Sequence, residues 1–154
     1  MTVGSAMKEA YFEAVVMIER LHRLFLEVIK IELDRIGTPD INNVQALVLY
    51  NIGENQLTVG ELTNRGYYLG SNVSYNLRKM VQNDYVIQIP SPHDRRSSHV
   101  KLSAKGVALY NKLDKVLGGH AQGLQEKVAS PSDMATFCST LRKLESFWSG
   151  FLSR

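Results

Sequence analysis

Apolar residues recur every three or four positions over most of the chain, a spacing that predicts a mainly helical protein. The first such run predicts a long helix that ends near Ile36, before a Gly-Thr-Pro sequence. A second helix is predicted to start at a cap on Asp40 or Asn42 and to end at Gly53. The pair Thr58 and Glu61 then has the spacing of a capping box at the start of a short third helix.

Residues 71–82 predict a fourth helix with two unlike faces. Val73, Leu77 and Met80 fall on one apolar stripe. Polar residues occupy the opposite face, namely Ser71, Asn72, Tyr75, Arg78, Lys79 and Gln82. We expect this helix to be buried on one side and to present the other to a polar partner.

The hydrophobic period changes after this helix. Asn83-Asp84 can end it in a left-handed turn, and residues 85–89 and 99–102 predict two short strands. The loop between the strands holds Pro90, Pro92 and the run Asp94-Arg95-Arg96. Two helices joined by a short turn and followed by a strand, a basic turn and a strand predict a winged helix-turn-helix.

Two further helices are predicted, one capped by Ser103 and one that begins after Ser130-Pro131. Three glycines, Gly118, Gly119 and Gly123, predict a kink or break in the first of them. The last helix has an apolar seam that ends in aromatic residues, and the first helix has another. One small domain can hardly cover both seams, so we expect residues 1–36 and 104–154 to be dimerisation helices that flank a winged-helix DNA-binding region over 40–103. An intrachain helical bundle is the alternative.

Charge is concentrated in the middle of this single predicted domain of 154 residues. Residues 71–106 hold six Lys or Arg against two Asp, a balance of +4, whereas the whole chain is +3 from 18 basic and 15 acidic residues. The rest therefore sums to −1, from 12 basic and 13 acidic residues. A basic surface beside an exposed polar helix favours double-stranded DNA as a partner, and a solvated charged face without a partner is the alternative.

Other function classes find little support. No signal peptide and no run of about 18 apolar residues is present, which favours a cytoplasmic protein with no membrane partner. A phosphate-binding glycine loop, a nucleophile elbow and a metalloprotease helix are missing too, so we expect no enzyme, no metal site and no cofactor. The single cysteine, Cys138, fits a buried structural residue better than an oxidant sensor.

The order of these elements resembles the MarR family of bacterial transcriptional regulators. The most specific match is the run DRRSSHVKLSAKG over 94–106, which is similar to the DRR-containing wing of that family and to the start of the helix that follows it. The resemblance implies a homodimer that binds a pseudo-palindromic operator and responds to a small molecule. Residues 65–77 more narrowly resemble LdtR-type members, which implies control of cell-wall remodelling (L,D-transpeptidase) or stress genes.

Candidate DNA-binding residues follow from the exposed helix face and from the wing. Ser71, Asn72, Ser74 and Tyr75 are candidates for contacts to bases, and Arg78 and Lys79 for contacts to phosphates. The resemblance places the wing in the minor groove, with Arg95 or Arg96 inserted and Asp94 orienting an arginine. Tyr75 stands where many members carry a basic residue, so their base preference does not transfer. A helical interaction module with a degenerate winged helix that does not bind DNA is the alternative function.

The resemblance also implies a cleft for a small aromatic or phenolic effector. Its candidate lining residues are His22, Phe25, Asn43, Leu47, Tyr67, Tyr68 and Tyr110. Core packing is the alternative role for each of them.

Overall fold

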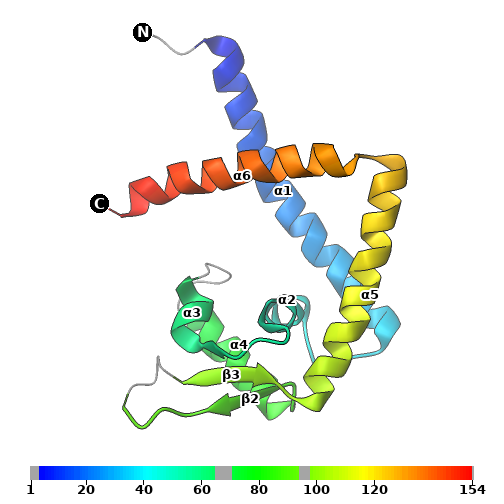
Figure 1. Cartoon of the computed structure of the whole chain (residues 1–154), viewed down its shortest axis with the longest axis vertical. Coiled ribbons are helices and arrows are strands. Elements are labelled where there is room, and N and C mark those ends of the chain that lie inside the picture. Colours follow the sequence, from blue (N-terminus) through cyan, green and yellow to red (C-terminus); the bar gives the residue numbers. More distant parts are fainter. Residues whose placement is uncertain (1–3, 65–70, 94–97, 154) are drawn as a thin grey trace. The chain divides into compact units, whose positions relative to one another are not determined.

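The computed structural model describes residues 4–64, 71–93 and 98–153 (Figure 1). The chain divides into two compact units, residues 1–113 and 114–154. The elements are, in chain order, α1 (Ser5–Ile36), α2 (Asn43–Ile52), β1 (Leu57–Thr58), α3 (Val59–Asn64), α4 (Ser71–Gln82), β2 (Val86–Ile89), β3 (His99–Leu102), α5 (Ala104–Lys127) and α6 (Pro131–Leu152). The predicted fold class, mainly helical with a small sheet, is confirmed.

The first helix, α1, ends where the sequence predicts. Gly37 adopts a φ of 84°, and its N–H donates to the carbonyl of Leu33 over 2.9 Å. Glycine reaches this left-handed conformation without the steric cost that a Cβ atom imposes, which makes it a common helix terminator. Among the described residues of α1, Ile29 and Leu33 are buried. This helix therefore packs into the first unit near its C-terminal end.

The second helix, α2, starts from Asn42, one of the two predicted caps. The Asn42 side chain accepts from the backbone N–H of Gln45, and the Gln45 side chain accepts from the backbone N–H of Asn42. This reciprocal pair satisfies two amides that the first helical turn leaves without partners. The other predicted cap, Asp40, has different contacts, which are described below.

The sheet is antiparallel, with strand order β1-β3-β2. Val86 of β2 lies opposite Leu102, and Ile89 lies opposite His99, so the two strands form the predicted hairpin. On the other edge of β3, Leu57 of β1 lies opposite Val100. The sequence analysis did not predict β1, because two residues are too few to show an alternating pattern.

The core of the first unit lies where α2 and α4 meet the sheet. Leu49, Met80, Tyr85 and Val100 are each no more than 2% exposed. Burial of a large apolar side chain contributes about 1.5–3 kcal/mol, so these residues fix α4 against the sheet. The winged helix is thus built around α4.

The fifth helix, α5, runs without interruption past Gly118, Gly119 and Gly123, so the predicted break is wrong. A helical glycine costs about 1 kcal/mol relative to alanine, but it keeps its N–H donor, whereas proline does not. The cost is therefore too small to stop a helix that is favoured on both sides of the glycines.

The second unit contains the later part of α5 and all of α6. Ser130 and Asp133 form a capping box at the start of α6, and Pro131 occupies its first turn, as predicted. The backbone N–H of Ser130 donates to Asp133 and lowers the pKa of its carboxyl from the ordinary value. No described residue of α6 is buried, although its sequence is rich in large apolar side chains.

Candidate nucleic-acid interface

The two predicted faces of α4 are present in the structure. Val73, Leu77 and Met80 are buried. The candidate contact residues whose side chains are described, Asn72, Ser74, Tyr75, Arg78 and Lys79, are all exposed. Ser71 is the first residue of α4. One turn of an α-helix takes 3.6 residues, so Tyr75, Arg78 and Lys79 lie near the middle of the exposed face, and Asn72 and Ser74 lie on its two flanks.

Tyr75 and Lys79 form a pair on this exposed face. The Lys79 ammonium lies 5.9 Å from the centroid of the Tyr75 ring, close enough for a weak cation–π attraction. Tyr75 is 52% exposed, so its ring is accessible on this face of α4. A flat aromatic ring beside an ammonium group can contact both the apolar edge of a base and a phosphate.

A buried hydrogen bond ties the middle of α4 to α2. The Gln45 side chain donates to the Asn76 side-chain oxygen over 3.3 Å, and both residues are less than 9% exposed. Gln45 is also a member of the capping box at Asn42, so its side-chain amide is hydrogen-bonded through both its nitrogen and its oxygen. The sequence analysis did not single out Asn76. The Asn-x-x-Gln spacing at residues 42–45 was a readable signal for the box, but no local signal links residues 31 positions apart.

The wing strand β2 packs against α4, and β3 pairs with β2. Lys101 is exposed on β3. At the root of the wing, the Ser98 carbonyl accepts from the N–H of Val59, the first residue of α3. A backbone hydrogen bond therefore connects the helix-turn-helix to the wing. Asp94, Arg95 and Arg96 lie outside the described residues.

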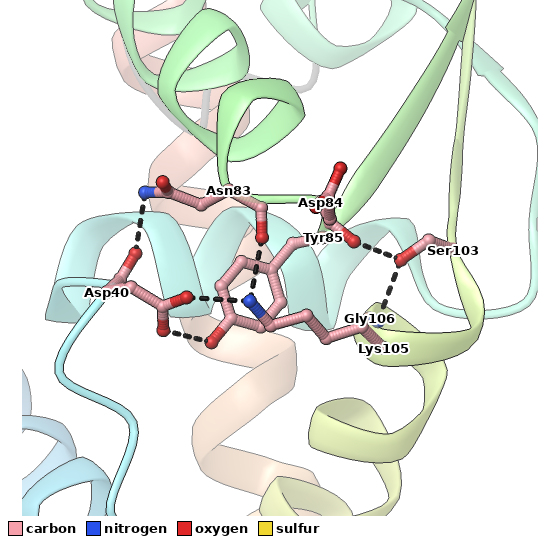
Figure 2. Close-up of polar contacts among 7 residues, drawn as sticks. All are labelled: Asp40, Asn83, Asp84, Tyr85, Ser103, Lys105 and Gly106. Atoms are coloured by element: carbon pink, nitrogen blue, oxygen red, sulfur yellow. Dashed lines mark hydrogen bonds and ion pairs between the residues drawn. The ribbon is translucent and has the colours of Figure 1, made fainter.

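Asp40 joins three segments of the first unit at the C-terminal end of α4 (Figure 2). Its two carboxylate oxygens accept from the Tyr85 hydroxyl over 2.5 Å and from Lys105 Nζ over 2.6 Å, and its backbone carbonyl accepts from the Asn83 side chain over 2.9 Å. We call the contacts among Asp40, Asn83, Tyr85 and Lys105 the Asp40 junction. The sequence analysis assigned Asp40 no role beyond a possible cap.

Electrostatics at the Asp40 junction favour an ionised carboxylate. The hydrogen bond from Lys105, followed by the one from Tyr85, lowers the pKa of Asp40 from its ordinary value of 3.8. Burial, followed by the hydrogen bond to Asp40, raises the pKa of Tyr85 above its usual range. The Lys105 ammonium also lies 4.2 Å from the centroid of the Tyr85 ring.

Comparison with known proteins identifies the family of this chain. The family model described as MarR family matches residues 40–97, which include α2, α3, α4 and β2. The chain is also 39% identical over 138 residues to the exopolysaccharide II synthesis transcriptional activator ExpG of Rhizobium meliloti (strain 1021), a match that covers 90% of this chain and 71% of that relative. The chain belongs to the MarR family.

Solved structures confirm the MarR fold over almost the whole chain. Staphylococcus aureus MarR in complex with salicylate and kanamycin gives a TM-score of 0.74 at 19% identity and covers 95% of both chains. Streptococcus pneumoniae FabT in complex with DNA gives a TM-score of 0.64 at 20% identity and covers 90% of this chain and 99% of that one. This chain is accordingly a transcriptional regulator of the MarR family.

The residues predicted for an effector site of this MarR protein lie on several elements. His22 and Phe25 are exposed on α1, and Leu47 is half-buried in α2. The Asn43 side chain donates to the carbonyl of Leu26 over 3.1 Å, which ties α2 to α1. The Tyr110 ring stacks on Tyr50 with centroids 5.0 Å apart. Tyr67 and Tyr68 lie outside the described residues. The effector site stays a prediction.

A cavity of about 390 Å³ lies where α1 meets the start of α2. Its lining residues are Glu27, Lys30, Leu33, Asp34, Thr38, Pro39, Ile41, Asn42 and Asn43. It shares Asn43 with the predicted effector set, and its other walls are charged, polar or aliphatic, with no aromatic side chain. Within the described residues, no three His, Cys, Asp or Glu side chains are grouped so that they could hold a metal ion, and no helix is long and apolar enough to cross a membrane.

Proposed function

We propose that this MarR protein regulates transcription as a homodimer and that each copy places α4 in the major groove of one half of a pseudo-palindromic operator. The observation that carries the proposal is the exposed polar and basic face of α4 on a helix whose other side is buried. A major groove about 12 Å wide admits one α-helix. Two copies related by twofold symmetry require half-sites about 10 bp apart.

Each candidate DNA-binding side chain on α4 has a proposed role that follows from its chemistry. Asn72 and Ser74 can form hydrogen bonds with base edges, as can Ser71 at the helix start, and the Tyr75 ring can pack against a thymine methyl group. Arg78 and Lys79 bind phosphates and set the register on the duplex. The affinity then depends on salt, because each neutralised phosphate releases counterions.

The wing supplies the proposed second contact. The hairpin register pairs Ile89 with His99, so the connection between β2 and β3 begins and ends at that end of the sheet. Asp94, Arg95 and Arg96 lie between these two strands in the sequence. Arginine suits the narrow, electronegative minor groove beside the half-site, and Asp94 would orient one of the two guanidinium groups.

Exposed apolar side chains on the terminal helices support the homodimer. On α1, Met7 is 66% exposed and Phe12 is 55% exposed, and on α6 Phe147 and Phe151 are 60% and 57% exposed. Contiguous apolar helix faces of this kind mark protein interfaces. A second copy of the chain is the proposed partner for both helices.

The proposal includes a small-molecule effector. A relative of the same fold, Staphylococcus aureus MarR, has been solved with salicylate, an aromatic acid. A ligand that favours a dimer geometry with mis-spaced α4 helices lowers DNA affinity by its differential affinity for the two geometries. Calorimetric titration with aromatic and phenolic acids tests this part, and no saturable binding by any of them would contradict it.

The proposed targets are genes for cell-surface polymers. The Rhizobium meliloti relative is described as an activator of exopolysaccharide II synthesis, and the sequence run over 65–77 resembles LdtR-type regulators. Both point to the cell envelope, with stress genes as the further class that the resemblance implies. Transcript profiling of a deletion strain tests the assignment, and unchanged envelope and stress transcripts would contradict it.

The main test is binding of the purified protein to a fluorescent DNA fragment from upstream of its own gene, with an unrelated fragment of equal length as the control. We expect preferential binding to the upstream fragment, and a plot of log affinity against log salt whose slope falls by about one for each phosphate contact removed. Arg78→Ala should show that change, whereas Lys112→Ala, which removes an exposed lysine from α5, should not. Equal binding to both fragments at every salt concentration would contradict the proposal and favour a protein-interaction module.

A further inference from the structure

The Asp40 junction connects elements that are far apart in the sequence. Asp40 lies between α1 and α2, Asn83 and Tyr85 lie in the turn between α4 and β2, and Lys105 lies in the first turn of α5 (Figure 2). Lys105 Nζ donates to the Asn83 carbonyl over 2.8 Å as well as to Asp40. A single residue, Asp40, thus joins the end of the first helix to the end of α4 and to the start of α5.

Two of these three segments are fixed to each other without Asp40. The Ser103 N–H donates to the Tyr85 carbonyl over 3.0 Å, and the Ser103 hydroxyl donates to the Asp84 carbonyl. A Cβ atom at Gly106 would lie 2.2 Å from the Tyr85 carbonyl oxygen, so the two backbones are in direct contact there. The α4–β2 turn and the start of α5 are therefore one packed body, and Asp40 attaches that body to the segment between α1 and α2.

The Gln45–Asn76 hydrogen bond attaches α4 to the same region at a second point. Asn76 lies near the middle of α4, and Asn83 follows its last residue. Apolar contacts at Val73, Leu77 and Met80 hold α4 against the core, but such contacts are not directional. One directional contact allows the helix to turn about that point, whereas two of them fix its direction.

The polar contacts of Asp40 contribute little to folding by themselves. The Asp40 and Lys105 side chains are 39% and 46% exposed, and ion pairs in such positions add little to stability. Asp40 nevertheless uses both carboxylate oxygens and its carbonyl. Its contacts specify geometry more than they add stability.

We propose that the Asp40 junction fixes the direction of α4 relative to α1 and that Asp40 is a positioning residue for operator recognition. The inference rests on the proposed function, because direction matters only if two α4 helices must enter two half-sites at once. An α4 helix held at one point would still bind bases, but it would accept half-sites at other spacings. The junction therefore sets the selectivity for half-site spacing.

The test compares full-length variants on three synthetic operators derived from the upstream sequence that the wild-type protein binds. One has the natural half-site spacing, and the other two have spacings one base pair shorter and one base pair longer. Asp40→Asn keeps the size of the side chain and removes the charge that pairs with Lys105. Asp84→Asn is the matched control, because it removes the same charge from a neighbouring residue whose part in these contacts is its backbone carbonyl. Asparagine tolerates the φ of 65° at that position.

We expect wild type and Asp84→Asn to discriminate equally between the three operators. In Asp40→Asn, the ratio of the affinity for the natural operator to the affinity for the altered operators should fall by about fivefold. This is the scale expected for the loss of one ion pair and one hydrogen bond. The melting temperature of Asp40→Asn at neutral pH should lie no more than a few degrees below that of the control, and its fraction of dimer should match, whereas a merely structural role of Asp40 would lower stability without changing the spacing selectivity. Lys105→Met should give the same change, and the double variant should add little to either single variant.

The failure of this inference is distinct from the failure of the proposed function. One outcome is that wild type prefers the natural operator and that Asp40→Asn and Lys105→Met keep its full spacing selectivity. This outcome would overturn the proposed role of the junction and leave the proposed function standing. Wild type that cannot distinguish any operator from unrelated DNA would overturn the proposed function itself, and the junction with it. If Asp40→Asn does not fold, Lys105→Met alone decides between these outcomes.

Discussion

The winged-helix core and the terminal helices of this MarR protein differ in how fully one chain covers its own apolar residues. In the core, Leu49 and Val100 are completely buried, and α4 has one covered and one polar face. On α6, by contrast, no described residue is buried, and Phe147 and Phe151 form an exposed edge-to-face pair with centroids 5.2 Å apart. The core buries its own apolar residues within one chain, whereas the terminal helices leave many of theirs exposed. Recognition and assembly can thus be disturbed separately.

The largest effect should come from Gly106→Ala, which places a Cβ atom against the Tyr85 carbonyl in the core. Overpacking of this kind typically costs 1–3 kcal/mol, and a backbone atom cannot move aside as a side chain can, so we expect a loss of about 3 kcal/mol in the free energy of unfolding. Gly118→Ala is the matched control on the same helix, where a Cβ atom meets nothing within 4 Å. Urea denaturation should show Gly118→Ala to be as stable as wild type or up to about 1 kcal/mol more stable. Equal stability of the two variants would contradict the close contact.

The next effect concerns the terminal helices. Phe147→Ser should weaken the dimer at least about tenfold, because buried aromatic side chains dominate interface energetics, while the circular dichroism of the variant stays helical. Arg142→Ala, an exposed polar position on the same helix, serves as the control. Sedimentation equilibrium measures both. A wild-type protein that is monomeric at all concentrations would contradict the difference between core and terminal helices.

A smaller effect is expected on the α4 face. Arg78→Ala should reduce operator affinity by about 1–2 kcal/mol without a change in unfolding free energy, because its side chain is exposed and its proposed partner is the DNA. Fluorescence anisotropy at several salt concentrations measures the affinity, and thermal denaturation measures the stability. A loss of stability equal to the loss of affinity would mean that Arg78 belongs to the core and not to the interface.

The smallest effect is the acid dependence of the Asp40 junction. The pKa of Asp40 is lowered in the folded state, so its contribution to stability is present above the unfolded pKa of about 3.9 and is lost as the pH falls through the folded value. We expect Asp40→Asn to lose less stability than wild type below about pH 4. The difference should be no more than about 1 kcal/mol, because both charges are partly screened by solvent. Urea midpoints at pH 3 and pH 6 provide the measurement. Asp84→Asn is the control, and it should lose as much stability on acidification as wild type, because Asp40 is still present.

Much of the fold follows from local patterns in the sequence. The period of apolar residues predicts α1, α4 and the β2–β3 hairpin, and local chemistry predicts the cap at Ser103 and the start of α6 after Ser130-Pro131. Local rules fail where two neighbouring residues are equally good helix caps, or where a residue destabilises a helix only slightly. Asp40 and Asn42 are equally good caps in isolation, and the choice is settled by distant partners of Asp40 such as Lys105. The three glycines of α5 are weak helix formers, but they do not interrupt the helix.

The candidate site also has one part that local sequence patterns predict and another that depends on residues far apart in the chain. The exposed face of α4 could be predicted because it depends on a helical period within twelve residues. The Gln45–Asn76 bond and the Asp40 junction could not, since they join residues between 22 and 65 positions apart. The exposure of the candidate residues on α4 could therefore be predicted, whereas the groups that we propose to orient α4 became visible in the three-dimensional structure.

The most direct test of α4 as the DNA-reading element is methylation interference on the operator. Methylation of guanine N7 blocks the major groove and leaves the minor groove open. We predict that methylated guanines prevent binding in two segments centred about 10 bp apart on one side of the duplex, one for each α4 helix of a dimer. Interference absent from both segments, or binding that survives methylation of every guanine, would contradict the account.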